Sequence, residues 1–209
     1  MAKIYLSPSD QKHNVYASGS TTEAEQCRRI AEACAAELRA RGHQVEVGDE
    51  QSTMWSRVSE SNADHVDLHV PIHTNAFNAA VMGTRIFYYN KNSKGFTAAS
   101  RIFEELAPLS PGESDQMQSW PALYELKHTN APAAYVECEF HDTRAGAEWI
   151  INNTEKIGKA IARGIDRYFG GNSKPRFCVQ IGAFTERTNA DKMLTQVKKY
   201  FPDAYIKEA

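Results

Sequence analysis

Three side chains that can bind a metal or move a proton occur where an α/β protein usually builds its active site. An apolar run that begins at Val66 stops at His73, and this pattern predicts a buried strand with a histidine at its carboxyl end. Glu23 lies in the first turn of a predicted helix, and Glu137 lies inside the apolar strand 134–140. Burying a carboxylate in a strand costs several kcal/mol of folding free energy unless the group is paired or ligated. The position of Glu137 therefore favours a functional role for this residue over a structural one. A histidine and a carboxylate as ligands, with a second glutamate as base, indicate a zinc hydrolase.

Two histidines of the central strand are four residues apart, which in a helix is the spacing of a metal-binding pair. In a strand, however, His69 and His73 share one face and lie about 13 Å apart, because each residue advances the chain by roughly 3.3 Å. One zinc ion cannot contact both, so we expect His73 to be the ligand and His69 to be a buried or supporting histidine. Pro71 cannot donate a ladder hydrogen bond, and we expect strand pairing to stop near Val70.

The elements that must position these residues alternate along the chain. The predicted strands are 3–6, 44–47, 66–76, 83–89 and 133–140, and the predicted helices are 22–41, 52–63, 95–106 and 144–169. Thr22 and Glu25 form a capping box for the first helix. This alternation predicts an α/β fold of three layers, with a mostly parallel twisted sheet and helices on both faces. Residues 107–121 are rich in Pro, Ser and Gln, and we expect a long loop there.

The composition shift near residue 170 predicts two domains. Residues 1–169 form the larger domain, and the Gly-Gly-Asn-Ser-Lys-Pro segment 170–175 is a linker. Residues 176–209 are expected to form a small βαβ unit, with strands 177–183 and 204–207 around a helix at 187–200. A unit of that size can hardly bury a core alone.

Composition and charge narrow the classes of partner and compartment. The chain has 209 residues, a net charge of −2 and 42% hydrophobic residues, which gives no electrostatic argument for nucleic acid or an anionic membrane. No apolar run is long enough to span a membrane, and no signal-peptide pattern opens the chain. We therefore expect synthesis in the cytoplasm and release by another route. The four cysteines are expected to be free rather than a disulfide framework.

The order of these motifs resembles a known family. Glu23 in the first helix is followed by Ile-His73-Thr-Asn75-Ala, and then by Pro132-Ala-Ala-Tyr-Val-Glu137-Cys-Glu-Phe140. Over residues 3–169 this resembles the zinc-dependent N-acetylmuramoyl-L-alanine amidases of the amidase-3 class, which are cell-wall hydrolases of bacteria and phages. The resemblance implies one zinc per chain, Glu23 and His73 as ligands, Glu137 as the catalytic glutamate and Asn75 as a substrate-binding residue. Glu139 stands where glycine is usual.

The third zinc ligand departs from the family pattern. The family usually carries Asp-x-Gly-His after the first strand, and this chain has Ser-Pro-Ser-Asp-Gln at residues 7–11. Strict alignment puts Asp10 at the ligand position. We expect His13, three residues later in the same loop, to be the third ligand, with His141 as its substitute and Asp10 or Gln11 as the remaining choices.

The C-terminal segment resembles half of a SPOR domain, a module that binds peptidoglycan. A full domain has two βαβ repeats and this chain has one, so we expect a homodimer that completes the sheet; native mass spectrometry showing only monomer would contradict this. The predicted partner is peptidoglycan, and the predicted setting is phage lysis or mother-cell lysis. Two alternatives remain, namely a zinc peptidase of related fold and a non-catalytic wall-binding protein.

Overall fold

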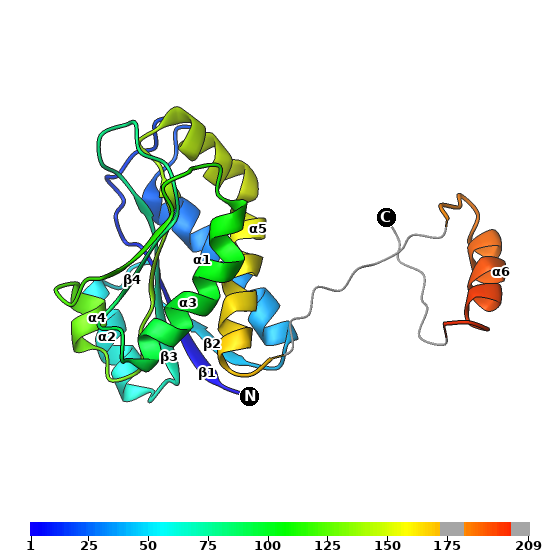
Figure 1. Cartoon of the computed structure of the whole chain (residues 1–209), viewed down its shortest axis with the longest axis horizontal. Helices are drawn as coiled ribbons and strands as arrows, with labels where there is room; N and C mark the ends of the chain where they lie inside the picture. Colours follow the sequence, from blue (N-terminus) through cyan, green and yellow to red (C-terminus); the bar gives the residue numbers. More distant parts are fainter. Residues whose placement is uncertain (172–181, 202–209) are drawn as a thin grey trace. The chain divides into compact units, whose positions relative to one another are not determined.

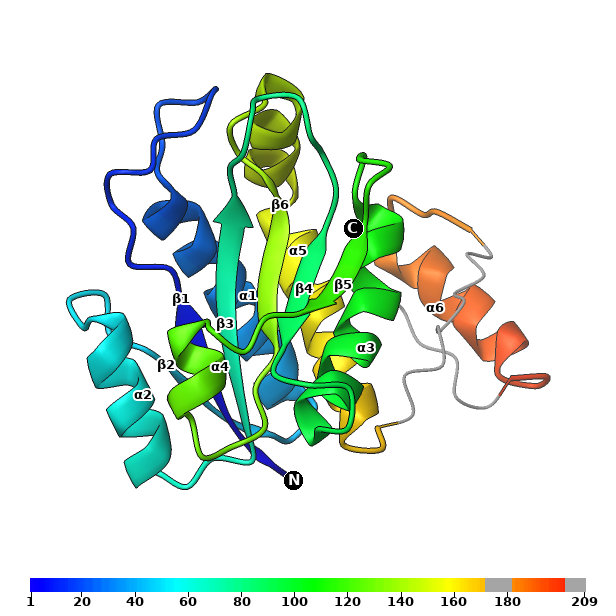
Figure 2. The same cartoon turned by 60° about the vertical axis from the view of Figure 1, so that its left-hand side comes forward.

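The computed structural model describes residues 1–171 and 182–201, and the chain divides into two compact units, Met1–Ser173 and Lys174–Ala209. The first unit is a sheet between two layers of helices (Figures 1 and 2). Its strands are β1 (Lys3–Pro8), β2 (Gln44–Val47), β3 (Leu68–Asn75), β4 (Arg85–Tyr88), β5 (Gln116–Ser119) and β6 (Tyr135–Phe140). Its helices are α1 (Glu23–Ala40), α2 (Met54–Ala63), α3 (Lys94–Leu106), α4 (Tyr124–His128) and α5 (Arg144–Tyr168), with a 3-10 turn at Ala107–Leu109.

The sheet has six strands in the order β2-β1-β3-β6-β4-β5. The first four are parallel to one another, whereas β4 pairs antiparallel with β6 and β5 pairs parallel with β4. The carboxyl ends of β1, β3 and β6 therefore meet at the same edge, because neighbouring parallel strands end together. The predicted α/β fold with a mostly parallel sheet is confirmed.

The two faces of the sheet have different chemistry, because strand side chains alternate between them. On one face Leu68, Val70 and Ile72 of β3 belong to the main core, which α1, α3 and α5 cover. The intervening residues of β3 point to the face covered by α2 and α4, where His69 is fully buried. Tyr135 of β6 belongs to a smaller cluster on this second face. Of the residues predicted for a site, His73 and Glu137 therefore face this second layer.

Helix α1 carries another predicted site residue, Glu23, in its first turn. The position of the helix is fixed by its N-terminal cap and by its packing in the core. The Thr22 hydroxyl accepts a hydrogen bond from the Glu25 backbone N–H, and the Glu25 side chain accepts one from the Thr22 N–H, which confirms the capping box. Along the core, α1 packs closely on α5 at Gly158, where an added Cβ would stand 2.5 Å from the Ile30 carbonyl oxygen. The helix is thereby held with its first turn at the edge where β1, β3 and β6 end.

Two expectations about strands were wrong. Pairing does not stop near Val70: Pro71 continues β3 in register with Ser7 of β1. The proline removes one donor, but its neighbours keep the ladder, as in the bond from the Ser9 N–H to the Ile72 carbonyl at 2.9 Å. The expected loop at 107–121 contains the edge strand β5, whose Gln-Met-Gln-Ser sequence lacks the apolar alternation by which strands are recognised.

The second unit is described by one helix, α6 (Arg187–Val197), which ends three residues before the predicted helix does. The strands expected at 177–183 and 204–207, and with them the sheet through which we expect dimerisation, lie almost wholly outside the described residues. Among residues 1–171 and 182–201, no helix is long and apolar enough to cross a bilayer. The three cysteines described here, Cys27, Cys34 and Cys138, are buried and free, as expected.

Candidate active site

A carboxylate and an imidazole meet at the edge where the parallel strands end. Glu23, from the first turn of α1, accepts a hydrogen bond at its Oε1 from Nδ1 of His73, near the end of β3, at 2.8 Å. Both side chains are buried. Burial alone would raise the pKa of Glu23, but the hydrogen bond and charge of His73 outweigh it and lower that pKa. Burial would likewise lower the pKa of His73, but the hydrogen bond with Glu23 and the nearby carboxylates raise it. The two residues predicted to be ligands are thus in direct contact.

Glu137 lies beside this pair on the neighbouring strand. It is in register with His73 across β3 and β6, and Tyr135, two residues earlier, stacks its ring on the His73 imidazole at a centroid distance of 4.6 Å. The residue is half-buried, but its Oε2 atom is shielded from solvent and has no hydrogen-bond partner. Burial raises the pKa of Glu137 from 4.5 to about 8, and the charge of Glu23 adds to the rise. A carboxyl group with such a pKa can take and release a proton near neutral pH.

This raised pKa predicts how the stability of the metal-free protein depends on pH. The folded state holds the Glu137 proton more tightly than the unfolded chain does, so this group makes folding less favourable as pH rises from 4.5 to about 8. In the presence of chelator, Glu137→Gln should remove this contribution, so the variant should lose less stability than the wild type between about pH 5 and about pH 8. Urea unfolding at both pH values measures the difference. Equal pH dependence of the two proteins would show that Glu137 is not a buried acid.

A second carboxylate, which carries no local signal in the sequence, faces the same histidine. Glu125 of α4 is buried, and its Oε1 accepts hydrogen bonds from the Ser7 hydroxyl at 2.5 Å and from Nε2 of His69 at 3.1 Å. Its Oε2 lies 4.0 Å from Nε2 of His73. Burial would raise the pKa of Glu125, but the bond with His69 and the charges of both histidines lower it. One carboxylate therefore lies between the two histidines, and His69 is the buried supporting residue that was expected.

The candidates for a third ligand lie around this group at different depths. His13 is exposed in the loop between β1 and α1, whereas His141 is buried, with its Nδ1 2.9 Å from the Thr74 hydroxyl and its ring stacked on Tyr16. The Asp10 carboxylate accepts a hydrogen bond from the Met54 N–H at the start of α2.

Gln11 is linked to the pair through another amide. Asn14 donates from the same Nδ2 atom to Oε1 of Gln11 at 2.6 Å and to Oε2 of Glu23 at 2.7 Å. Of the four candidates, Gln11 is therefore the one joined to Glu23 by a side-chain hydrogen-bond chain. The choice of third ligand stays a prediction.

The donors can be compared with what zinc requires. Carboxylate and imidazole groups are both zinc ligands, and Glu23 and His73 already touch. The unpartnered Oε2 of Glu137 is a buried polar atom that a bound cation or its water would satisfy. Across residues 1–171 and 182–201, no group of three or more His, Cys, Asp or Glu side chains is placed to hold one ion. Glu23 and His73 therefore supply two donors of the types that zinc binds, and no third donor of these types is placed to bind the same ion within the described residues.

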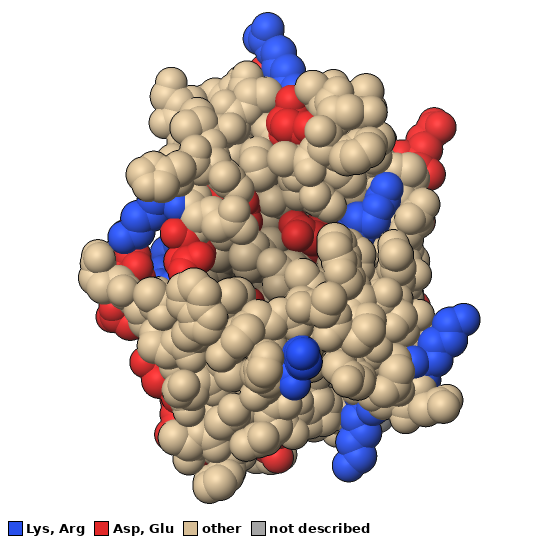
Figure 3. Space-filling view, turned by 90° about the vertical axis from the view of Figure 1, so that its left-hand side faces the viewer, with Lys and Arg blue, Asp and Glu red and all other residues tan. Residues whose placement is uncertain are grey.

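The face of the molecule on which α2 and α4 lie is hollowed near its centre (Figure 3). Figure 3 views the face on which α2 and α4 lie, and it shows acidic side chains inside and beside a hollow near the centre of that face. Asn75, the expected substrate-binding residue, is half-buried at the end of β3, where its Oδ1 accepts the Ala76 N–H at 2.8 Å. The side-chain amide nitrogen of Asn75 is the atom that could donate to a ligand. The role of Asn75 in substrate binding stays a prediction.

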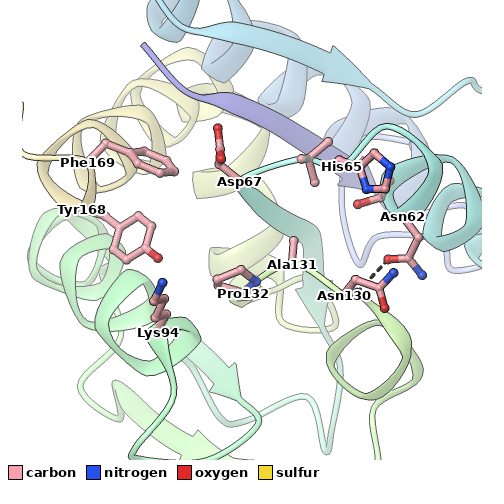
Figure 4. Close-up of a pocket in the computed structure, with 11 residues that line it drawn as sticks. Asn62, His65, Asp67, Lys94, Asn130, Ala131, Pro132, Tyr168 and Phe169 are labelled. Atoms are coloured by element: carbon pink, nitrogen blue, oxygen red, sulfur yellow. Dashed lines mark hydrogen bonds between the residues drawn. The ribbon is translucent and has the colours of Figure 1, made fainter.

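A separate cavity of about 400 Å³ lies at the opposite end of the sheet. Asp67 lines it just before β3 begins, Pro132 lines it before β6, and Tyr168 closes it from the end of α5 (Figure 4). Asn130 donates its backbone N–H to the Asn62 side chain at its rim. The cavity contains none of the predicted site residues.

Solved structures of other proteins share the fold of residues 1–171. The catalytic domain of CwlV, an N-acetylmuramoyl-L-alanine amidase from Bacillus (Paenibacillus) polymyxa var. colistinus, is 17% identical, with a TM-score of 0.73 over 81% of this chain and 99% of that one. The amidase AmiC2 of Nostoc punctiforme is 18% identical, with a TM-score of 0.68 over 81% and 97%. The catalytic domain of the CD27L endolysin targeting Clostridia Difficile is 23% identical, with a TM-score of 0.66 over 82% and 99%. These similarities establish the fold.

Sequence comparison supplies the family. No curated protein matches the chain significantly. The profile of the SPOR domain matches residues 173–209. The Amidase_3 profile, N-acetylmuramoyl-L-alanine amidase, matches residues 7–167, which is most of the chain. The chain therefore belongs to the Amidase_3 family of N-acetylmuramoyl-L-alanine amidases, and it carries a SPOR segment after its amidase domain.

Proposed function

We propose that this chain is a zinc-dependent amidase that hydrolyses the bond between the lactyl group of N-acetylmuramic acid and L-alanine in peptidoglycan. The observation that carries the proposal is the buried contact between Glu23 and His73, with the unpartnered Glu137 carboxylate beside it. Family membership supports the same chemistry. CwlV and AmiC2, which share the fold, are amidases of this specificity.

The residues of the site have distinct roles in this proposal. Glu23 and His73 would hold one zinc ion together with a third donor, predicted at His13 with His141 as its substitute. When bound, zinc would polarise the scissile carbonyl and make a water molecule more acidic. Glu137 would accept a proton from the attacking water and then donate it to the leaving amine of L-alanine. The raised pKa of Glu137 suits both transfers, because its protonated and ionised forms are both accessible near neutral pH.

The C-terminal segment supports peptidoglycan as the partner. The SPOR match at residues 173–209 joins a wall-binding module to the amidase domain. We propose that this segment holds the enzyme on glycan strands, that two chains pair through it, and that the enzyme acts in cell lysis. Native mass spectrometry of the full chain tests the pairing, since it should show a dimer at micromolar concentration.

The bond that is cleaved can be identified from the products. Digestion of purified peptidoglycan should release intact stem peptides that begin with a free L-alanine amino group, and leave glycan strands with free lactyl carboxylates. Mass spectrometry of the soluble peptides, with an amine-reactive label, measures the first product. New amino termini inside the stem peptide would contradict the proposal and favour a peptidase instead.

A further inference from the structure

We propose that Glu125 is a positioning residue that orients His73 for metal binding. The inference rests on the proposed function, since it concerns how the protein holds a ligand of the proposed zinc. It assigns a role to a carboxylate of the short helix α4, which contributes to the site from the opposite side to α1.

Glu125 itself is firmly held by its neighbours. Its Oε1 is fixed between the Ser7 hydroxyl on β1 and Nε2 of His69 on β3. His69 in turn is held by the Ser61 hydroxyl at 2.9 Å from its Nδ1, and its ring stacks on Tyr5 with a centroid distance of 5.4 Å. Because all its neighbours are buried, the carboxylate cannot turn away, and its Oε2 is left facing His73.

As a metal ligand, His73 needs a partner at the ring nitrogen that does not bind the ion. Its Nδ1 faces Glu23, the other proposed ligand, at 2.8 Å, so Nδ1 is the nitrogen placed to bind a shared ion. A histidine that binds metal through one ring nitrogen usually donates its other ring N–H to a carboxylate, which fixes the tautomer and the ring orientation. The Oε2 of Glu125, at 4.0 Å from Nε2, is the carboxylate oxygen on that side of the ring. A shift of about 1 Å would bring the two atoms to hydrogen-bond distance.

The packing of His73 does not depend on the charge of Glu125. The ring of His73 already stacks on Tyr135 and is itself buried, so its place in the core does not require a charge at Nε2. A neutral glutamine at position 125 could still accept from Ser7 and from His69. The role proposed for Glu125 toward His73 is therefore separate from this packing role, because Oε1 is the atom bonded to Ser7 and His69, whereas Oε2 is the atom that faces Nε2 of His73.

The test compares Glu125→Gln with Glu139→Gln as the matched control. Glu139 is also a fully buried carboxylate, but its Oε1 accepts the Gly83 N–H at 2.6 Å and its Oε2 accepts the Ser110 hydroxyl, away from either histidine. The zinc dissociation constant of the full chain is measured by competition with a chromophoric chelator. We expect Glu125→Gln to weaken zinc binding by about 10- to 100-fold, and Glu139→Gln to leave it unchanged.

A second readout reports the imidazole directly. In the zinc-loaded wild type, long-range proton–nitrogen NMR of histidine-labelled protein should show the proton of His73 on Nε2, with the downfield shift of a hydrogen bond to a carboxylate. In Glu125→Gln this proton should move upfield or exchange too fast to be seen. A purely structural role for Glu125 would leave the signal where it is. Circular dichroism confirms that the variants compared are folded, and Glu125→Asp, which keeps the charge but shortens the side chain, replaces the glutamine variant if that variant does not fold.

The positioning role of Glu125 and the proposed zinc-dependent function can fail separately. Wild-type zinc affinity and an unchanged His73 signal in a folded Glu125→Gln variant would overturn the positioning role and leave the proposed function intact. A wild-type protein that binds no zinc would overturn the zinc chemistry and the positioning role together.

Discussion

Glu137→Gln is expected to lower the rate of peptidoglycan hydrolysis by about 10²- to 10⁴-fold, the usual contribution of a general base. Glutamine has nearly the same shape but cannot accept the proton of the attacking water. The substitution also removes a buried carboxyl group whose Oε2 has no hydrogen-bond partner, so the fold should be retained. The initial rate of turbidity loss of purified cell walls measures the effect, with zinc content measured on the same samples.

The expected pattern is loss of rate with zinc and fold intact. The control is Glu139→Gln, which removes a carboxyl group two residues away on the same strand. Rapid lysis by a folded Glu137→Gln variant would show that another group moves the proton. Simultaneous loss of zinc would show instead that Glu137 acts as a ligand.

His73→Ala is expected to remove both zinc binding and hydrolysis. The substitution deletes the one imidazole that lies between Glu23 and Glu125, and it leaves Glu137 beside them. The remaining donors are carboxylates that repel one another without the shared partner. Zinc content should fall from about one per chain to near zero, and lysis should fall to the level of buffer alone, because the proposed water activation needs the metal.

His65→Ala is the matched control for this histidine. His65 is exposed just before β3, at the end of the sheet away from the site, and should keep both zinc and lysis. The same assay applied to His13→Ala and His141→Ala decides which of them is the third ligand. A folded His73→Ala variant that retained one zinc per chain would contradict the assignment of His73.

The elements that bury apolar residues could be predicted from the sequence. The apolar run that begins at Val66 predicted the central strand, and the capping box at Thr22 predicted the start of α1. Glu137 could be recognised because a carboxylate between apolar strand residues is unusual. His73 could be recognised because its strand ends nearby. These residues have a local signal, since period and burial are both visible in a short window of sequence.

Other features depend on contacts between distant segments and have no such signal. Glu125 lies in a five-residue helix, and its burial follows from Ser7 and His69, which are 118 and 56 residues away in sequence. The edge strand β5 is polar and was therefore expected to be loop. The third ligand, expected at His13 with His141 as its substitute, has no family motif behind it, and the path of a loop is set by its tertiary contacts rather than by periodicity.

The central claim is that this chain is a zinc-dependent wall hydrolase, and zinc content measured together with chelator-sensitive lysis tests it most directly. The full chain is analysed for metal, and purified cell walls are then treated with the protein as isolated, after chelation, and after zinc is restored. We predict about one zinc per chain, lysis that is lost on chelation, and recovery with zinc. A protein that binds the walls but carries no zinc and lyses nothing under any of these conditions would contradict the account and identify a non-catalytic wall-binding protein.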